Sequence, residues 1–176
     1  METKDCEINI ESVIKSVQAD SFPGIIELFQ KSKKLAVIEG GSYEEFKSGP
    51  WPSSPGVYLI YQSEFLNPVY IGMTGKLKRG RNNILEYNSG KLKHRFLRWT
   101  PYKFQKEGEF QDHLQCIPTK KEIGDYVYNF PLSTIRVYCL SMDGMEYTLS
   151  PSFLEAILLQ HFVEVQKALP LVNQEF

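Results

Sequence analysis

The sequence predicts an α+β fold, in which a small sheet is flanked by helices and preceded by a helical N-terminal extension. Runs rich in β-branched and aromatic residues at 56–62 and 68–72, and alternating apolar and polar residues at 133–140, predict the strands. Apolar residues at helical spacing near both ends of the chain predict the helices. A length of 176 residues, 42% of them hydrophobic, suits one domain with a single core.

The first fifty residues form the predicted helical extension. Apolar residues recur at helical spacing over 10–17, and a second apolar set follows Pro23 over 25–29. The sequence SYEE at 42–45 has the spacing of a capping box and predicts a third, short helix. We therefore expect residues 1–50 to be helical.

The main domain is expected over 51–176, after a connector at 49–56 that is rich in proline and glycine. The first two strands after the connector are close in sequence, so the simplest pairing is antiparallel. The predicted elements are strands at 56–62 and 68–72, helices at 74–90 and 92–99, an irregular insertion around 100–130, a strand at 133–140 and a helix that starts at Ser150 and Pro151.

Basic residues are concentrated between Lys76 and Lys106. This segment holds ten basic residues and one acidic residue, whereas the whole chain holds 20 basic and 21 acidic residues and has a net charge of −1. A cationic segment on an otherwise acidic chain favours a polyanionic partner such as nucleic acid, and its aromatic rings suit stacking on bases. The alternative is a solvated pair of basic helices with a purely structural role.

The rest of the composition excludes several classes of protein. The three cysteines, Cys6, Cys116 and Cys139, form no CxxC pair, so we expect neither a disulfide framework nor a zinc site built from cysteines. No apolar run reaches the roughly 18 residues that a membrane span needs. The N-terminus has acidic residues where a secretion signal is basic. We expect a cytoplasmic protein with no membrane partner.

Several short motifs occur in the order that is typical of one nuclease family. They are GVY at 56–58, VYIG at 69–72, an arginine-rich stretch after it, FLEAILL at 153–159 and PLVN at 170–173. With these motifs the chain resembles the GIY-YIG nuclease family over about residues 55–173. The resemblance implies a small mixed or antiparallel sheet flanked by helices. It also implies hydrolysis of phosphodiester bonds in double-stranded DNA with one divalent cation, Mg²⁺ or Mn²⁺.

The resemblance implies four catalytic positions directly. Tyr58 and Tyr70 match the two motif tyrosines, Glu155 matches the metal-binding acid, and Asn173 matches the asparagine near the end of the domain. These residue types suit the chemistry, because a carboxylate holds a hydrated cation and an ionised tyrosine accepts a proton. A free tyrosine has a pKa of about 10, so nearby cations or the metal must lower the pKa of the base.

The catalytic arginine of the family matches two positions in this chain. Arg81 lies at about the expected distance along the chain from Tyr70, whereas Arg95 has the helical surroundings of the family, with Trp99 four residues later. Either guanidinium would contact a phosphate oxygen. Contacts to the DNA backbone are expected from the same basic segment, at Lys76, Lys78, Arg79, Lys91, Lys93, His94 and Arg98.

The site residues also have structural interpretations. The tyrosines suit the edge of a core, and Asn173 suits a turn. Glu155 follows Ser152 by three residues, which is the spacing of a capping box. Under that alternative Glu155 would face the backbone of its own helix.

The overall organisation favours one subtype of nuclease. The sequence shows no zinc finger or second DNA-binding module, so we expect a small site-specific enzyme of the restriction type that acts as a homodimer. The N-terminal helices and the 100–130 insertion would then supply sequence recognition or dimer contacts. A structure-specific repair or recombination nuclease, and a non-catalytic nucleic-acid-binding module, are the alternatives.

Overall fold

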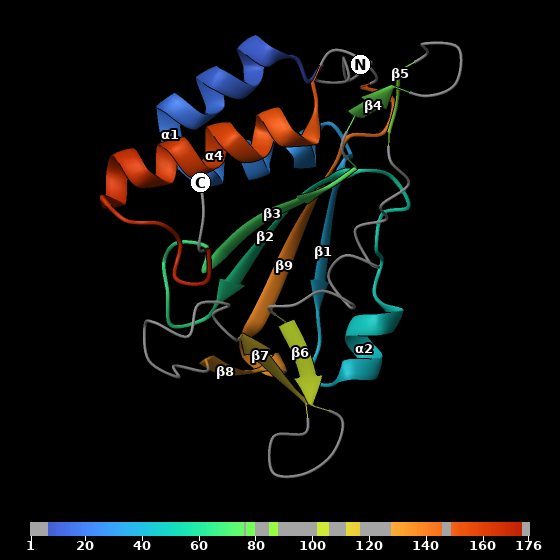
Figure 1. Cartoon of the computed structure of the whole chain (residues 1–176), viewed down its shortest axis with the longest axis vertical. Coiled ribbons are helices and arrows are strands. Elements are labelled where there is room, and N and C mark those ends of the chain that lie inside the picture. The colour runs from blue at the N-terminus through green and yellow to red at the C-terminus, as the bar shows by residue number, and fades with distance from the viewer. Residues whose placement is uncertain are drawn as a thin grey trace, which may run out of the picture.

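The computed structural model describes residues 7–75, 77–79, 85–87, 102–105, 112–116, 128–145 and 149–173. It confirms an α+β fold (Figure 1). The elements are α1 (Ile10–Lys31), β1 (Leu35–Glu39), α2 (Tyr43–Ser48), β2 (Gly56–Gln62), β3 (Tyr70–Thr74), β4 (Leu77–Arg79), β5 (Leu85–Tyr87), β6 (Tyr102–Gln105), β7 (His113–Cys116), β8 (Tyr128–Pro131), the 3-10 helix η2 (Leu132–Thr134), β9 (Ile135–Ser141) and α4 (Pro151–Gln166).

The central sheet has four strands in the order β1-β9-β2-β3, and every neighbouring pair is antiparallel. The predicted antiparallel pairing of β2 with β3 is confirmed. β4 pairs with β5, and β6, β7 and β8 form a separate three-stranded sheet. Figure 1 shows α1 and α4 side by side over one face of the central sheet.

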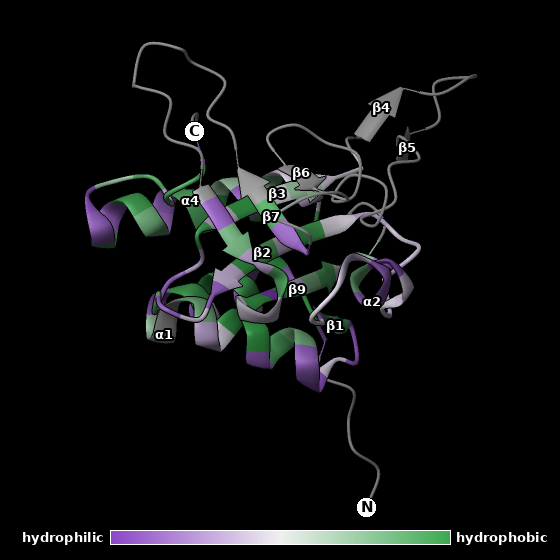
Figure 2. Ribbon diagram, turned by 90° about the horizontal axis from the view of Figure 1, so that it is seen from below, coloured by the Kyte–Doolittle hydropathy of each residue, from purple (hydrophilic) through white to green (hydrophobic). Residues whose placement is uncertain are grey.

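The central sheet separates two hydrophobic clusters. On one face, Val57, Leu59 and Ile71 pack with the buried residues of α1 and α4. On the other face, Tyr58 and Tyr70 pack with residues from α2, β7, β8 and the C-terminal segment. Because successive side chains of a strand point to opposite faces, both faces of β2 and parts of both faces of β9 are buried, and Figure 2 shows hydrophobic residues along these strands.

Helix α1 is one continuous helix, although two separate apolar sets on either side of Pro23 were expected. Asn9 caps it, and the Asn9 and Ser12 side chains form a reciprocal capping box. Proline removes one backbone hydrogen bond inside a helix. Here the buried residues on both sides, Val17, Ile25 and Phe29 among them, belong to one cluster, so packing holds the helix together through the proline.

The prediction that residues 1–50 are helical is wrong at β1. Residues 35–39 form a strand that pairs with β9, with Leu35 opposite Leu140 and Glu39 opposite Arg136. The run is short and β-branched, and its partner lies about a hundred residues later in the chain. The N-terminal part therefore contributes an edge strand to the central sheet.

The helix predicted at 74–90 is wrong where the structure describes this segment. Residues 77–79 and 85–87 are the paired strands β4 and β5. Gly80, Asn82 and Asn83 are weak helix formers, which explains why the apolar spacing did not yield a helix there. The helix predicted at 92–99 lies outside the described residues. The insertion around 100–130 was predicted to be irregular, but its described residues form the paired strands β6 and β7 and the start of β8.

The predicted helix starts at 42–45 and at Ser150 are confirmed. The Ser42 side chain accepts from the Glu45 N–H, and Glu45 bonds back to the Ser42 N–H, so the capping box forms. Ser150 caps α4, and Pro151 is its first residue. Within the described ranges, no helix combines the length and hydropathy that a membrane span requires.

Candidate active site

Two tyrosines from neighbouring strands stack on one face of the central sheet. Tyr58 lies opposite Gly72 and Ile60 lies opposite Tyr70, so Tyr58 and Tyr70 are diagonal neighbours that face the same side. Their ring centroids are 5.8 Å apart with an interplanar angle of 29°. The sequence did not fix this register, and the structure brings the two motif tyrosines together.

Gly72 is what allows the two rings to lie this close. A Cβ atom at Gly72 would lie 2.4 Å from Cε1 of Tyr70 and 2.8 Å from both Cζ and the hydroxyl oxygen of Tyr58. Both distances are below those of real Cβ contacts, so any side chain at this position would displace one of the rings. Gly72, the glycine of the second motif, therefore matters because it has no side chain and leaves room for both rings.

The tyrosine pair is largely buried. Tyr58 is 1% exposed and Tyr70 is 9% exposed, and both belong to the cluster that includes Ile60, Val69 and Val172. Tyr70 begins β3, an edge strand, so it is the ring nearer to solvent.

Asn173 is bound to the backbone of β3. Its side-chain amide donates to the Ile71 carbonyl at 2.8 Å and its carbonyl oxygen accepts from the Ile71 N–H at 2.9 Å. The Val172 N–H also donates to the Val69 carbonyl at 2.9 Å. Both functional groups of the Asn173 amide are therefore committed to the residue between Tyr70 and Gly72. This geometry suits a positioning residue that holds β3.

Replacing Asn173 with alanine is expected to destabilise the protein by about 1–3 kcal/mol, because both backbone groups of Ile71 lose their partner. For a chain of this size the melting temperature would fall by roughly 2–4 °C per kcal/mol. Thermal unfolding measures the effect. Asn173→Asp, which keeps the acceptor and loses the donor, should lie between the wild type and Asn173→Ala. An unchanged melting temperature for Asn173→Ala would contradict this role.

Glu155 lies on a helix that packs on the other face of the sheet. Ser150 caps α4 through the Phe153 N–H, so Ser152 is not the cap and the Ser152–Glu155 capping box does not form. Glu155 is half-buried beside the buried residues Leu154 and Leu158. Because α4 packs with the face opposite to the tyrosine rings, the fold does not itself place Glu155 against them.

Glu155 is the acid that the sequence predicts as the metal ligand. No group of three or more His, Cys, Asp or Glu residues gathers at a metal-binding distance among the residues that the structure describes. Mg²⁺ often keeps several waters and is held by one or two carboxylates together with substrate phosphates. A single carboxylate such as that of Glu155 would be compatible with this mode of binding.

The remaining candidate residues lie outside the described side chains. Arg81, Arg95, Lys76, Lys91, Lys93, His94 and Arg98 are outside the described residues. Lys78 and Arg79 lie in β4, where only the backbone is described. The contribution of the basic segment and the choice between the two arginines stay predictions.

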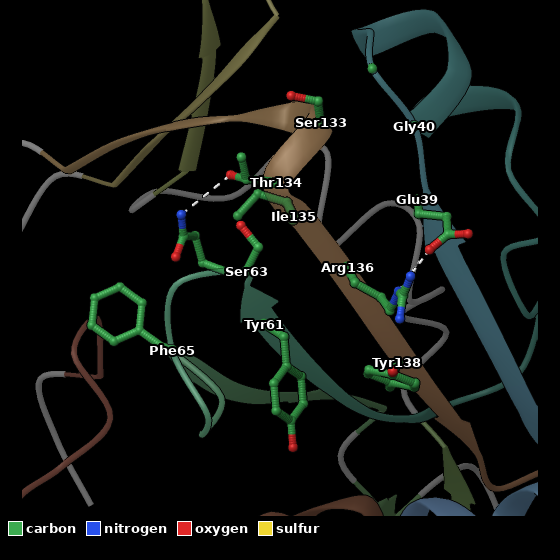
Figure 3. A pocket seen from close by; sticks show the side chains of 12 residues that line it. Glu39, Gly40, Tyr61, Ser63, Phe65, Ser133, Thr134, Ile135, Arg136 and Tyr138 are labelled. Atoms are coloured by element: carbon green, nitrogen blue, oxygen red, sulfur yellow. Dashed lines mark hydrogen bonds and ion pairs between the residues drawn. The ribbon is translucent and has the colours of Figure 1, made fainter.

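A pocket of about 580 Å³ lies on the α1 side of the sheet, beyond the part that the helices cover. Figure 3 shows Tyr61 and Tyr138 next to the ion pair of Arg136 with Glu39. The two rings meet edge to face at 5.4 Å, and the Arg136 Nε donates to Glu39 at 2.7 Å. Hydrogen bonds with Tyr138 and Glu39 raise the pKa of Arg136.

This pocket was not predicted, although the polar positions of β9 indicate it. Arg136 and Tyr138 alternate with buried Ile135 and Val137, which signals one face that is not fully covered. The opposite charges of Arg136 and Glu39 offset each other, and their side chains are 53% and 57% exposed. A site without net cationic charge does not suit a phosphate backbone.

The stability of the protein is expected to fall above about pH 10 through Tyr61. Burial, together with Tyr138, raises the pKa of Tyr61 above its ordinary value of about 10. Below about pH 10 the Tyr61 phenol is protonated in both the folded and the unfolded protein, so it does not change stability with pH. Above about pH 10 the unfolded protein loses the proton first, so unfolding becomes easier. Urea unfolding at pH 8 and pH 11 should show a smaller alkaline loss for Tyr61→Phe than for the wild type. Equal losses would contradict the assignment.

Comparisons with known proteins do not assign the chain to a family. No protein-family model matches the chain, and neither the curated proteins nor the solved structures contain a significant match. Function must therefore be inferred from the residues and their geometry.

Proposed function

We propose that the protein is a metal-dependent DNA endonuclease, of the small site-specific restriction type. The observation that carries the proposal is the stacked pair of Tyr58 and Tyr70 on neighbouring strands, with Gly72 leaving the space for both rings. The order of motifs in the sequence and the basic segment at 76–106 support the same activity. The partner would be double-stranded DNA, and cutting both strands would require a homodimer.

The proposed roles follow from exposure and position. Tyr70, the more exposed ring, accepts a proton from the attacking water, and Tyr58 holds the ring of Tyr70 by stacking. Asn173 fixes the β3 backbone next to Tyr70. Glu155 holds the cation, which when bound supplies positive charge at the scissile phosphate. The proposal requires the Glu155 carboxylate to reach past β3, which is the edge strand over which α4 packs.

The activity is tested by incubating the purified protein with plasmid DNA and Mg²⁺ or Mn²⁺. Discrete linear fragments support a restriction-type enzyme, and EDTA should abolish them. Nicked circles, or preferential cutting of branched DNA, would favour a repair or recombination nuclease.

The second candidate function is a non-catalytic nucleic-acid-binding module. It is favoured by the nearly complete burial of Tyr58 and by the position of α4 on the opposite face of the sheet. DNA that stays intact at saturating protein, with both metals, would support this module and contradict the nuclease.

Replacing Tyr70 with phenylalanine is expected to remove the rising limb of the pH profile for cleavage, because the phenolate that accepts the proton is absent. Tyr58→Phe keeps the stacked ring and should retain the shape of the profile. The measurement is the initial cleavage rate between pH 6 and pH 10. Wild-type profiles for both variants would exclude proton transfer by either tyrosine.

A further inference from the structure

A second, smaller pocket lies at the end of the central sheet where β2 begins. Its volume is about 270 Å³. The residues that give it polar character come from the segment after α1, the connector before β2 and the end of β9, namely Lys33, Lys34, Ser53, Ser54, Ser141 and Asp143. None of these residues belongs to the tyrosine site.

Hydrogen bonds hold the three segments of this pocket together. The Ser141 N–H donates to the Lys34 carbonyl at 2.9 Å, and the Met142 N–H donates to the Pro55 carbonyl at 2.9 Å. The hydroxyls of Ser54 and Ser141 lie 2.6 Å apart. The pocket is therefore built on the sheet and does not depend on a single surface loop.

The charge of the pocket favours an anion. Lys33 and Lys34 supply two ammonium groups, and Asp143 supplies one carboxylate, so the net charge is positive. The Lys34 ammonium donates to the Asp143 backbone carbonyl, and this bond uses one of the three N–H donors of Lys34. Lys33 has a φ of 56°, a conformation in which glycine is the usual residue after a helix, so a lysine at this position is unusual.

We propose that this pocket binds one phosphate group. Ammonium and hydroxyl groups are common donors to phosphate oxygens. The source is either a phosphodiester of the DNA backbone, which depends on the proposed function, or a free phosphate group, which does not. Ser141 lies opposite Gly56, two residues before Tyr58 on β2, which is about 7 Å along the strand. A DNA strand held in this pocket would thus be anchored near the tyrosine pair.

The basic segment starts at the same end of the sheet. Gly56 lies opposite Thr74, the last residue of β3, and residues 76–106 follow directly in the sequence. Figure 1 shows the start of β2 and the end of β3 together at the upper end of the sheet. The pocket would therefore add a fixed phosphate contact to a segment that already favours polyanions.

The test measures DNA binding by the full chain without divalent metal, as a function of KCl concentration. Each phosphate contact contributes about 0.9 to the slope of log K against log salt. The double variant Lys33→Gln/Lys34→Gln is expected to lower the slope by about 1. The control Lys15→Gln/Lys47→Gln removes the same charge from α1 and α2, away from the pocket, and should lower it less.

Inorganic phosphate is the second probe. Millimolar phosphate should raise the melting temperature of the wild type, and Asp143→Asn should enlarge the rise because it removes the opposing carboxylate. Ser53→Asp should abolish the rise in melting temperature. Because Ser53 is exposed, this variant replaces the lysine variant in the test if the lysine variant fails to fold. If a variant of the pocket loses the rise in melting temperature with phosphate and yet keeps the wild-type salt slope for DNA binding, that result would assign the pocket to free phosphate groups.

The outcomes separate this proposal from the nuclease. Equal salt slopes for the lysine variant and its control, together with no effect of phosphate, would overturn the phosphate site. The lysines would then serve only the carbonyl end of α1, where cations are also favourable. A reduced slope in a protein that never cleaves DNA would keep the site and overturn the nuclease.

Discussion

Glu155→Gln is expected to abolish DNA cleavage, with a loss of at least about 100-fold, while DNA binding stays within about twofold of the wild type. Glutamine has nearly the same shape but no charge, so it cannot hold a divalent cation in the same way. Loss of one group that stabilises charge in the transition state typically costs two to three orders of magnitude. Cleavage kinetics at saturating Mg²⁺, together with a binding measurement without metal, give both quantities.

The matched control for this variant is Glu164→Gln on the same helix. Glu164 is exposed and accepts a hydrogen bond from Gln160, so its replacement changes the same charge without reaching the sheet. It should cleave like the wild type. Full cleavage by Glu155→Gln would remove Glu155 from the mechanism, and the position of α4 on the opposite face of the sheet would then be the reason.

Gly72→Ala is expected to destabilise the central sheet strongly. The added methyl would overlap both tyrosine rings, and overpacking a dense core typically costs 1–3 kcal/mol. With two stacked rings to displace, we expect about 2–3 kcal/mol, or a fall of roughly 4–12 °C in the melting temperature. Urea unfolding and thermal unfolding both measure it.

Gly41→Ala provides the control for this effect. A Cβ at Gly41 would lie 3.6 Å from the Glu45 carboxylate, which is an ordinary contact. Its stability should change by less than about 0.5 kcal/mol. A Gly72→Ala protein as stable as Gly41→Ala would mean that the tyrosine rings can move apart freely, and the stacked pair would lose its significance.

The parts of the fold with local signals were predictable from the sequence. The alternation in β9 and the serine and proline at the start of α4 depend on residues that are neighbours in the chain. β1 was missed because a five-residue apolar run is ambiguous until its partner strand is known. The basic stretch was misassigned at β4 and β5 because apolar spacing was weighed above the weak helix propensity of Gly80, Asn82 and Asn83.

The candidate site was predictable in residue type and not in geometry. Tyr58 and Tyr70 could be named from their motifs, but a shift of one residue in the pairing of β2 and β3 would have turned the rings to opposite faces. The partner of Asn173 is Ile71, which is 102 residues away, so no local pattern indicates the bond. The face on which α4 packs is likewise a property of the whole fold.

The bonds of Val172 and Asn173 to β3 have a consequence for self-association. β3 is an edge strand of the central sheet. The unpaired backbone groups of an uncovered edge strand can pair with a strand of another molecule. The last described residues of the chain occupy that edge at Val69 and Ile71. Proteolytic removal of the C-terminus should therefore expose the edge of β3 and cause the protein to oligomerise or precipitate through intermolecular strand addition.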